Sequence, residues 1–398
     1  MTTQLPFQFF DCDNHYYEAL DAFTRHIESP YKKRAIQWAQ LDGKQRLLVG
    51  GRVNRFIPNP TFDPVGKPGA LDEYFRGRNP RGADLNALFG DLEPIPPAYR
   101  DRDARLALMD EQGMAGCILL PTLGVGMEQA LLPDLDATVA TFRAFNRWMD
   151  EDWGFAYQDR IYAPAMLSMR DLDRACEELD RILDAGARFI VLPAGPAYGR
   201  SPGDPYFDPI WSRINEAHAV VCYHIAEFHY QDNVASQWGW GLRPPFQFSA
   251  WQWQNTYGER PITDTLSALI FDNLFGRFPN IKVLVSEFGA EWVPHFIRHM
   301  DKSRGMGRLG PCLGGQLTER PSAIFKRHVR VVPYPEDDTV SLIERLDSTE
   351  TLLMGSDWPH AEGLREPADF YLKVVTLDEV TRRDFLRDNG MKLSSGTG

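Results

Sequence analysis

Cysteine is scarce in this sequence of 398 residues, and its spacing forms no recognisable motif. The number of cysteines is odd and no two form C-x-x-C; they stand at Cys12, Cys117, Cys176, Cys222 and Cys312. This pattern predicts neither a disulfide framework nor a zinc site built from thiolates. Long apolar runs are also missing, since none approaches the roughly 18 residues that a membrane-spanning helix needs. We therefore expect no membrane association.

Basic residues are outnumbered by acidic ones. The chain has 43 Lys and Arg against 55 Asp and Glu, which gives a formal net charge of −12. An acidic surface repels phosphate backbones, so nucleic acid is excluded as an expected partner. The first fifteen residues contain neither the basic stretch nor the apolar stretch of a signal peptide. Together with the scarcity of cysteine, this favours a cytoplasmic protein.

Motifs that bind nucleotides are absent as well. The closest approach to G-x-G-x-x-G is Gly124-Val125-Gly126, but Gln129 occupies the place of the third glycine. No Walker A run occurs in the sequence. Nothing in the chain therefore supports a nucleotide cofactor.

What the sequence does contain is a regular alternation of short apolar runs and amphipathic stretches. The runs expected to be strands are residues 7–11, 116–121, 162–167, 188–193, 220–224, 282–287, 329–333 and 351–355. Amphipathic stretches between them, expected to be helices, include residues 101–113, 136–153, 171–186 and 264–278. Strands that alternate with helices predict a parallel sheet with crossover helices. Eight such units favour a closed (β/α)₈ TIM barrel over an open sheet. The predicted fold class is α/β, with a single barrel domain over residues 1–398.

Three long insertions interrupt this rhythm, at about residues 41–100, 225–261 and 303–320. Long irregular segments of a compact barrel are usually lids, binding loops or subunit contacts. The second insertion is dense in aromatic residues, and we expect it to cover the active site. Exposed tryptophans there would be unusual on a free surface, so Trp240, Trp251 and Trp253 predict a homo-oligomer, with a hetero-oligomer as the alternative.

Catalytic residues of such barrels gather at the carboxyl ends of the strands. The first expected strand ends in Asp-Cys-Asp-Asn-His, where Asp13 and His15 lie two residues apart and point to the same side of an extended chain. Glu18 follows three residues later. A carboxylate and an imidazole with a common direction suit a divalent metal. The alternative is a loop aspartate that caps the next turn beside a hydrogen-bonded histidine.

Further strand ends carry groups of the same type. The fifth expected strand ends in His224 and the sixth in Glu287, while Asp357 and His360 follow the eighth. Each has an ordinary structural explanation when taken alone, as a buried histidine or as an acid near a helix start. Their occurrence at four strand ends favours a metal site. Its candidate ligands are Asp13, His15, Glu18, His224, Glu287 and Asp357.

Six segments, spread over nearly the whole chain, resemble those of a known family and occur in the same order as in that family. They are FFDCDNHYYEALDAF, DARLALMDEQGMAGCILLP, FNRWMDEDW, VVCYH, LIFDNLFGRFPNIKVLVSEFGAEWV and LLMGSDWPH. The family is the amidohydrolase superfamily, and these segments are most similar to its branch typified by aminocarboxymuconate semialdehyde decarboxylase. The resemblance implies a barrel enzyme whose metal ligands fall on Asp13, His15, His224 and Asp357.

This chain departs from the family pattern at two positions. Many members begin with His-x-His where this chain has Asp13-x-His15, and Glu287 stands where decarboxylases and hydrolases of the branch often have a histidine. Both changes replace nitrogen by oxygen, which shifts the metal preference toward Mn or Fe while Zn stays an option. Six candidate ligands exceed what one open metal needs, so we expect one or two ions per chain.

The leading hypothesis is a metal-dependent hydrolase or non-oxidative decarboxylase acting on a small carboxylated or carbonyl substrate. Asp357 would be the general base or proton shuttle, and Glu287 would bind the metal or orient water. His360 would hydrogen-bond the substrate or serve the structure. The first alternative is a dinuclear Fe or Mn/Fe monooxygenase, because the DNHYYE start resembles a superfamily subset with such enzymes. The second is a catalytically silent partner subunit.

Overall fold

The computed structural model describes residues 5–41, 43–54, 63–71, 74, 90, 92–226, 230, 234–241, 243 and 247–396. The expected insertions at 41–100 and 225–261 therefore lie partly outside the described residues. Within this described part, no helix is both long enough and apolar enough to cross a lipid bilayer.

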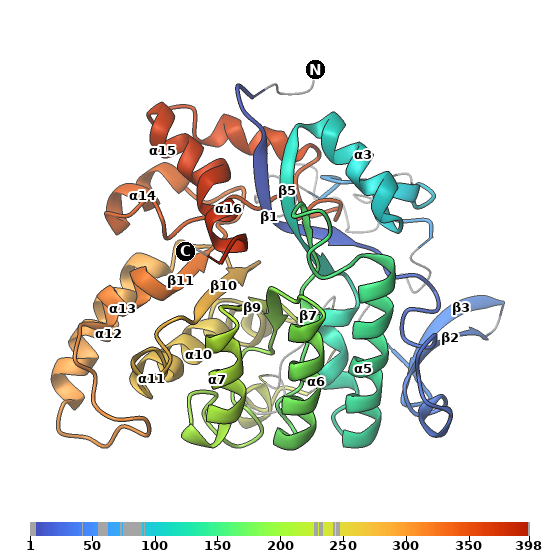
Figure 1. Cartoon of the computed structure of the whole chain (residues 1–398), viewed down its shortest axis with the longest axis horizontal. Helices are drawn as coiled ribbons and strands as arrows, with labels where there is room; N and C mark the ends of the chain where they lie inside the picture. Colours follow the sequence, from blue (N-terminus) through green and yellow to red (C-terminus); the bar gives the residue numbers. More distant parts are fainter. Residues whose placement is uncertain are drawn as a thin grey trace.

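Parallel strands form the centre of the molecule (Figure 1). One run of neighbours is β1 (Phe9–Tyr16), β5 (Met114–Pro121) and β6 (Ile161–Tyr162). The other run is β7 (Ala165–Met166), β8 (Phe189–Val191), β9 (Val220–His224), β10 (Lys282–Ser286) and β11 (Val329–Val331). β6 and β7 are two halves of the expected third strand, separated by Ala163 and Pro164. Proline has no N–H to donate to a neighbouring strand, which accounts for the break.

Residues 351–358 close the ring between β11 and β1. Val331 bridges to Leu352 on one side, and Asn14 bridges to Trp358 on the other. The backbone N–H of Cys12 also donates to the carbonyl of Met354 at 2.9 Å. The expected eighth strand is thus present as a bridging segment without a regular ladder. The α/β barrel class predicted from the sequence is confirmed.

Three of the expected helices appear where the sequence pattern places them: α3 (Arg102–Gln112), α5 (Leu135–Asp152) and α6 (Leu172–Asp184). Each begins after an aspartate whose side chain accepts a backbone N–H of the first turn, at Asp101, Asp134 and Asp171. Their apolar faces cover the barrel and bury large side chains such as Trp148 and Phe145, neither of which has any exposed surface. This burial is the main source of their stability.

Two segments differ from expectation. The amphipathic stretch at 264–278 is broken into α10 (Arg260–Phe271) and α11 (Leu274–Arg277) by Asn273, whose φ is +54°. Asparagine tolerates this left-handed conformation better than most residues, and it ends the first helix. In the glycine-rich third insertion, α12 (Val293–Gly307) continues through the first five residues of the segment expected to be irregular.

The remaining elements lie around the ring. The helices are α4 (Met127–Ala130), α7 (Asp208–Glu216), α9 (Ala250–Gln252), α13 (Pro321–His328), α14 (Thr339–Leu346), α15 (Glu379–Arg383) and α16 (Asn389–Ser394). The 3₁₀ turns are 29–31, 97–99, 124–126, 205–207, 235–238 and 367–373, and short π-helices occupy 253–257 and 384–388. An antiparallel sheet of β2 (Ile36–Leu41), β3 (Lys44–Val49) and β4 (Arg52–Val53) lies at the right-hand edge of Figure 1.

A substitution at Gly355 tests how tightly the closing segment packs in the ring of strands. A Cβ atom at this position would lie 2.5 Å from Asp13 Cβ and 2.5 Å from Val332 Cγ1. We expect Gly355→Ala to lower the free energy of unfolding by about 1–3 kcal/mol, because the added Cβ would push the closing segment away from Asp13 of β1 and from Val332. Denaturant unfolding of Gly305→Ala is the control, since a Cβ there meets nothing within 4 Å. Equal stability of the two variants would contradict this account.

Candidate metal centre

β1 supplies two groups to the barrel interior. Asp13 and His15 are 2% and 0% exposed, and Asp13 Oδ1 lies 3.3 Å from His15 Nε2. His15 Nε2 also lies 3.3 Å from Asp357 Oδ1, on the closing segment. The spacing of two residues along the strand therefore does place the carboxylate and the imidazole on one side.

β9 supplies His224 from its last position. Its Nδ1 lies 2.7 Å from the carbonyl of Ile225, which can only accept, so Nδ1 carries the proton. Nε2 is then unprotonated, and it lies 3.4 Å from His15 Nε2. Burial lowers the pKa of His224 to about 3 and holds the pKa of His15 well below its usual range. Both imidazoles are therefore neutral, which is the form that binds metals.

Glu287 and Asp357 reach the same point through an unusual backbone conformation. Their φ angles are +58° and +54°, a left-handed region that costs a non-glycine residue about 1–2 kcal/mol. Contacts on both sides hold them there. Tyr334 donates its hydroxyl to the carbonyl of Glu287 at 2.6 Å, and the N–H of Asp357 donates to the carbonyl of Asp13 at 2.8 Å. Strain of this kind is concentrated at functional sites.

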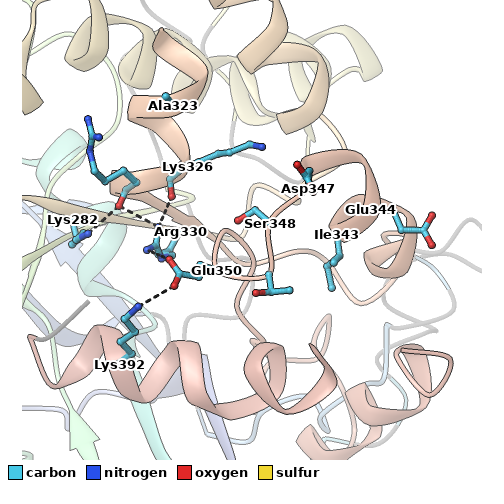
Figure 2. Close-up of a pocket in the computed structure, with 12 residues that line it drawn as sticks. Lys282, Ala323, Lys326, Arg330, Ile343, Glu344, Asp347, Ser348, Glu350 and Lys392 are labelled. Atoms are coloured by element: carbon cyan, nitrogen blue, oxygen red, sulfur yellow. Dashed lines mark hydrogen bonds and ion pairs between the residues drawn. The ribbon is translucent and has the colours of Figure 1, made fainter. Parts of the chain in front are cut away.

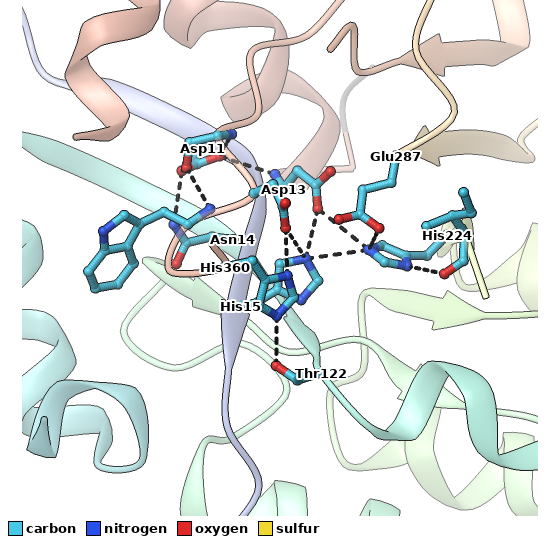
Figure 3. A network of polar contacts seen from close by, with 12 residues as sticks. Asp11, Asp13, Asn14, His15, Thr122, His224, Glu287 and His360 are labelled. Carbon is cyan, nitrogen blue, oxygen red and sulfur yellow. Dashed lines mark hydrogen bonds and ion pairs between the residues drawn. The ribbon is translucent and has the colours of Figure 1, made fainter. Parts of the chain in front are cut away.

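These groups converge into two sets of potential ligand atoms, each lying within 4.8 Å of one another (Figure 3). One set is Asp13, His15 and His224; the other is His15, Glu287, Asp357 and His360. His224 Nε2 and Glu287 Oε2, 3.4 Å apart, connect the two sets. The side chains expected at four separate strand ends are thus brought together at one mouth of the barrel.

The electrostatics of this cluster fit a divalent cation. Burial and the neighbouring carboxylates hold the pKa values of Asp13, Glu287 and Asp357 well above their usual range. Asp13 Oδ1 is fully buried and accepts no hydrogen bond. A buried carboxylate oxygen without a donor is costly unless a cation neutralises it. Two neutral imidazoles and several carboxylate oxygens form a donor set for Mn, Fe or Zn.

Glu18 lies apart from both ligand sets. Its Oε1 accepts the backbone N–H groups of Leu123 and Gly124, at 2.8 and 2.9 Å. Burial raises the pKa of Glu18 to about 7. This carboxylate fixes the loop after β5, and its assignment as a metal ligand remains a prediction.

His360 and Asp357 share a proton. Thr122 Oγ1 donates its only hydrogen to the carbonyl of Tyr16 at 2.7 Å, so it must accept from His360 Nε2, 3.0 Å away. With Nε2 protonated, the 2.7 Å contact between His360 Nδ1 and Asp357 Oδ1 needs a second proton. That proton lies either on the imidazole or on the carboxyl. The pair can therefore donate or accept a proton beside the ligand cluster.

A buried hydrogen-bond network adjoins the ligands on β1. Asp11 Oδ2 accepts from Ser356 Oγ at 2.5 Å and from Asn14 Nδ2 at 2.9 Å. Its Oδ1 accepts the backbone N–H groups of Ser356 and Asp13, at 3.0 and 3.2 Å. One carboxylate therefore ties the strand that carries Asp13 to the segment that carries Asp357.

Arg105 of α3 supplies the cation of this network. It is 1% exposed, and it donates to Asn14 Oδ1 at 2.5 Å and to the carbonyl of His15 at 2.7 Å. Sequence reasoning passed over Asp11 and Arg105, although each left a signal. Asp11 lies two residues before Asp13, so it belongs to the same alternating series along the strand as Asp13 and His15. Arg105 lies one helical turn before the buried Met109, on the face of α3 that meets the barrel.

A pocket opens beside His224. Its walls are mostly apolar and include Val125, Met166 and Leu192, with Glu128 as the buried acid. Ser168 Oγ donates to Glu128 Oε1 at 2.5 Å, and the hydroxyl of Tyr198 donates to the same oxygen. The free space between these groups is about 20 Å³, which is room for about one water molecule, so they surround His224 without forming a cavity of substrate size.

Comparison with known proteins agrees with this geometry. The family model described as amidohydrolase matches residues 11–393. The chain belongs to the amidohydrolase family. The resemblance drawn from the sequence is thereby confirmed. No curated protein matches the chain.

Solved structures place the chain among amidohydrolase barrels. An amidohydrolase from Mycobacterium avium subsp. paratuberculosis K-10 is 38% identical, with a TM-score of 0.89 and 98% of each chain covered. The 5-carboxyvanillate decarboxylase of Sphingomonas paucimobilis is 21% identical, with a TM-score of 0.58 over 78% of this chain and 86% of that one. A dihydroxybenzoic acid decarboxylase from Polaromonas sp. JS666, solved with manganese and 2-nitroresorcinol, is 18% identical, with a TM-score of 0.55 over 83% and 97%. The two decarboxylases share the fold.

Asp11→Asn tests the network beside the ligands. Both carboxylate oxygens of Asp11 accept hydrogen bonds, whereas the side-chain NH₂ group of asparagine can only donate. The variant therefore loses hydrogen bonds, and Asp13 and Asp357 should be held less firmly. We expect the affinity for a divalent metal to fall about 10- to 100-fold. Chelator competition followed by elemental analysis measures this, with Asp173→Asn on the exposed side of α6 as the control. Unchanged affinity would show that the network does not position the ligands.

Proposed function

We propose that this amidohydrolase is a metal-dependent hydrolase or non-oxidative decarboxylase of a small carboxylated or carbonyl substrate. The observation that carries the proposal is the convergence of two ligand sets that share His15. One set is Asp13, His15 and His224, and the other is His15, Glu287, Asp357 and His360. The manganese in a decarboxylase of the same fold supports a divalent ion here. We propose Mn, Fe or Zn as the cofactor, with one or two ions per chain.

In this proposal the chain's own residues divide the work. Asp13, His15 and His224 would hold the ion, while Asp357 contacts both His15 and His360 beside them. When bound, the ion would polarise a carbonyl or carboxylate and lower the pKa of a water molecule to about 7. Hydrolysis requires a base that takes a proton from water, whereas decarboxylation requires an acid that delivers one to carbon. The hydrogen-bonded pair of Asp357 and His360 would serve either purpose, because it can accept a proton or deliver the one that it shares.

Glu287 has a supporting part. Its pKa is held above the usual range by burial and by Asp357, and Oε2 lies 3.4 Å from His224 Nε2. From there it binds the ion or orients a water molecule.

The exposed tryptophans of the second insertion favour an assembly, for which we propose a cytoplasmic location on the basis of the sequence alone. Trp240 and Trp253 are 36% and 38% exposed, and Trp238 is 69% exposed. Trp251 lies 5.6 Å from Trp238 and 5.9 Å from Trp240, measured between ring centroids. We propose that this aromatic surface supports a homo-oligomer, with a hetero-oligomer as the alternative.

Asp357→Asn tests the assignment of the proton-transfer group. Asparagine keeps the shape but cannot hold or release the proton, so turnover on a panel of small aromatic carboxylates and carbonyl compounds should fall about 10²- to 10⁴-fold. The metal content of each preparation is measured in parallel, and Glu379→Gln on α15 is the control. Undiminished turnover would remove Asp357 from the mechanism.

The division of the ligand atoms into two sets that share only His15 favours a second candidate, a dinuclear oxygenase. Metal content decides between the two candidates. For the hydrolase or decarboxylase with a single ion we expect one Mn, Zn or Fe per chain by elemental analysis. Two Fe, or one Mn and one Fe, would favour oxygen chemistry. A chain that binds no metal and forms a stable complex with another protein would support a silent subunit.

A further inference from the structure

A cleft of about 860 Å³ lies at the opposite end of the strands from the metal centre (Figure 2). Lys282 is the first residue of β10, whereas Glu287 follows the last residue of the same strand. At about 3.3 Å per residue, the five steps between them correspond to about 16.5 Å. A ligand of this cleft therefore does not touch the metal ligands.

Basic side chains from several elements converge on the cleft. They come from the start of β10, the last turn of α13, the centre of β11 and the middle of α16: Lys282, Lys326, Arg327, Arg330 and Lys392. The chain as a whole carries a net charge of −12, so a cluster of five basic side chains is not expected from its average composition.

The carboxylates nearby do not balance these cations. Glu350 serves two of them at once, with Oε1 at 3.0 Å from Lys392 Nζ and Oε2 at 3.5 Å from Arg330 Nη2. Arg327 pairs outside the group, with Glu319. Lys282 and Lys326 form no ion pair among the described residues. The Nζ of Lys282 donates only to the carbonyl of Arg327, at 2.9 Å. Glu344 and Asp347 also line the cleft, at its exposed rim.

Burial makes this imbalance costly. The side chain of Arg330 is 6% exposed, and its guanidinium is occupied by the carbonyls of Lys326 and Val329 and by Glu350. Lys282 is half-buried and has no carboxylate partner among the described residues, and such a cation is stabilised by an anion that can enter. Because the planar fork of Arg330 is already in use, the groups left for a ligand are ammonium point charges and the hydroxyls of Ser348 and Thr349.

We propose that this cleft binds a multiply charged phosphate anion, either free or carried by a phosphorylated small molecule. Lysine ammonium groups are suited to phosphate oxygens, and the hydroxyls at the edge supply further donors. Lys282 and Lys326 contribute the charge, while Glu350 competes with the ligand for Lys392.

Calorimetric titration of the metal-loaded protein at low ionic strength tests the proposal, with inorganic phosphate, pyrophosphate and ribose 5-phosphate as probes. Lys282→Gln should weaken binding about tenfold, the value of one charge-assisted hydrogen bond. Lys326→Gln, which removes no ion pair or side-chain hydrogen bond among the described residues, should also weaken it. Glu350→Gln should tighten binding because the competing carboxylate is gone. Lys302→Gln on α12 is the control of equal charge.

Phosphate bound at the metal centre is common to all variants, so differences between them report on the cleft. Equal affinities in all five proteins, or tighter binding of succinate than of phosphate, would overturn the proposal. The order of the three probes distinguishes a free anion from a phosphorylated metabolite.

Proton uptake provides an independent measurement. Burial, Arg330, Lys392 and Arg327 lower the pKa of Lys282 to about 8, against the opposite effect of Glu350. An anion beside Lys282 raises this pKa, so binding at pH 8 should take up protons. The binding enthalpy should then depend on the ionisation enthalpy of the buffer in the native protein, and less so in Lys282→Gln. Identical buffer dependence in both proteins would contradict the assignment of Lys282.

Discussion

Buried negative charge at the mouth of the barrel is the constraint around which the site is arranged. Asp13, Glu287 and Asp357 come together where water is largely excluded, and each raises the pKa of another. Carboxylates in such a place must bind protons or bind a cation. The two neutral imidazoles cannot supply the positive charge, because burial keeps both unprotonated. The cluster is therefore in balance only when a metal ion, or shared protons such as the one between Asp357 and His360, compensates it.

The closure of the ring and the geometry of the site depend on the same contacts. Residues 351–358 carry Asp357, and they also complete the barrel between β11 and β1. Asp11 holds this segment through Ser356, and Arg105 holds the adjacent backbone of His15. A loss of barrel closure would therefore separate the ligands on β1 from Asp357. The left-handed conformation of Asp357 persists because this surrounding structure determines it.

The barrel and the residues that meet at its mouth could be predicted from the sequence, because both follow from short-range rules. Alternating strands and helices gave the ring, and polar residues at strand ends gave Asp13, His15, His224, Glu287 and Asp357. Features that depend on tertiary contacts could not be predicted. The break at Asn273, the positive φ of Glu287 and the proton between Asp357 and His360 are set by neighbours distant in sequence. For Glu18, proximity along the chain suggested the metal, whereas backbone amides of the loop after β5 hold its carboxylate.

The two ends of the barrel carry opposite charge, and the distance between them decides whether they compensate each other. The interior between Lys282 and Glu287 is apolar, with Val283, Leu284 and Val285 completely buried. At about 16.5 Å and an effective dielectric constant near 20, one pair of unit charges attracts by about 1 kcal/mol. Removing an ion from water costs several kcal/mol, so attraction along the strand is too weak to stabilise either cluster. The two clusters are therefore electrostatically independent, and the cation proposed at the mouth and the anion proposed at the base do not depend on each other.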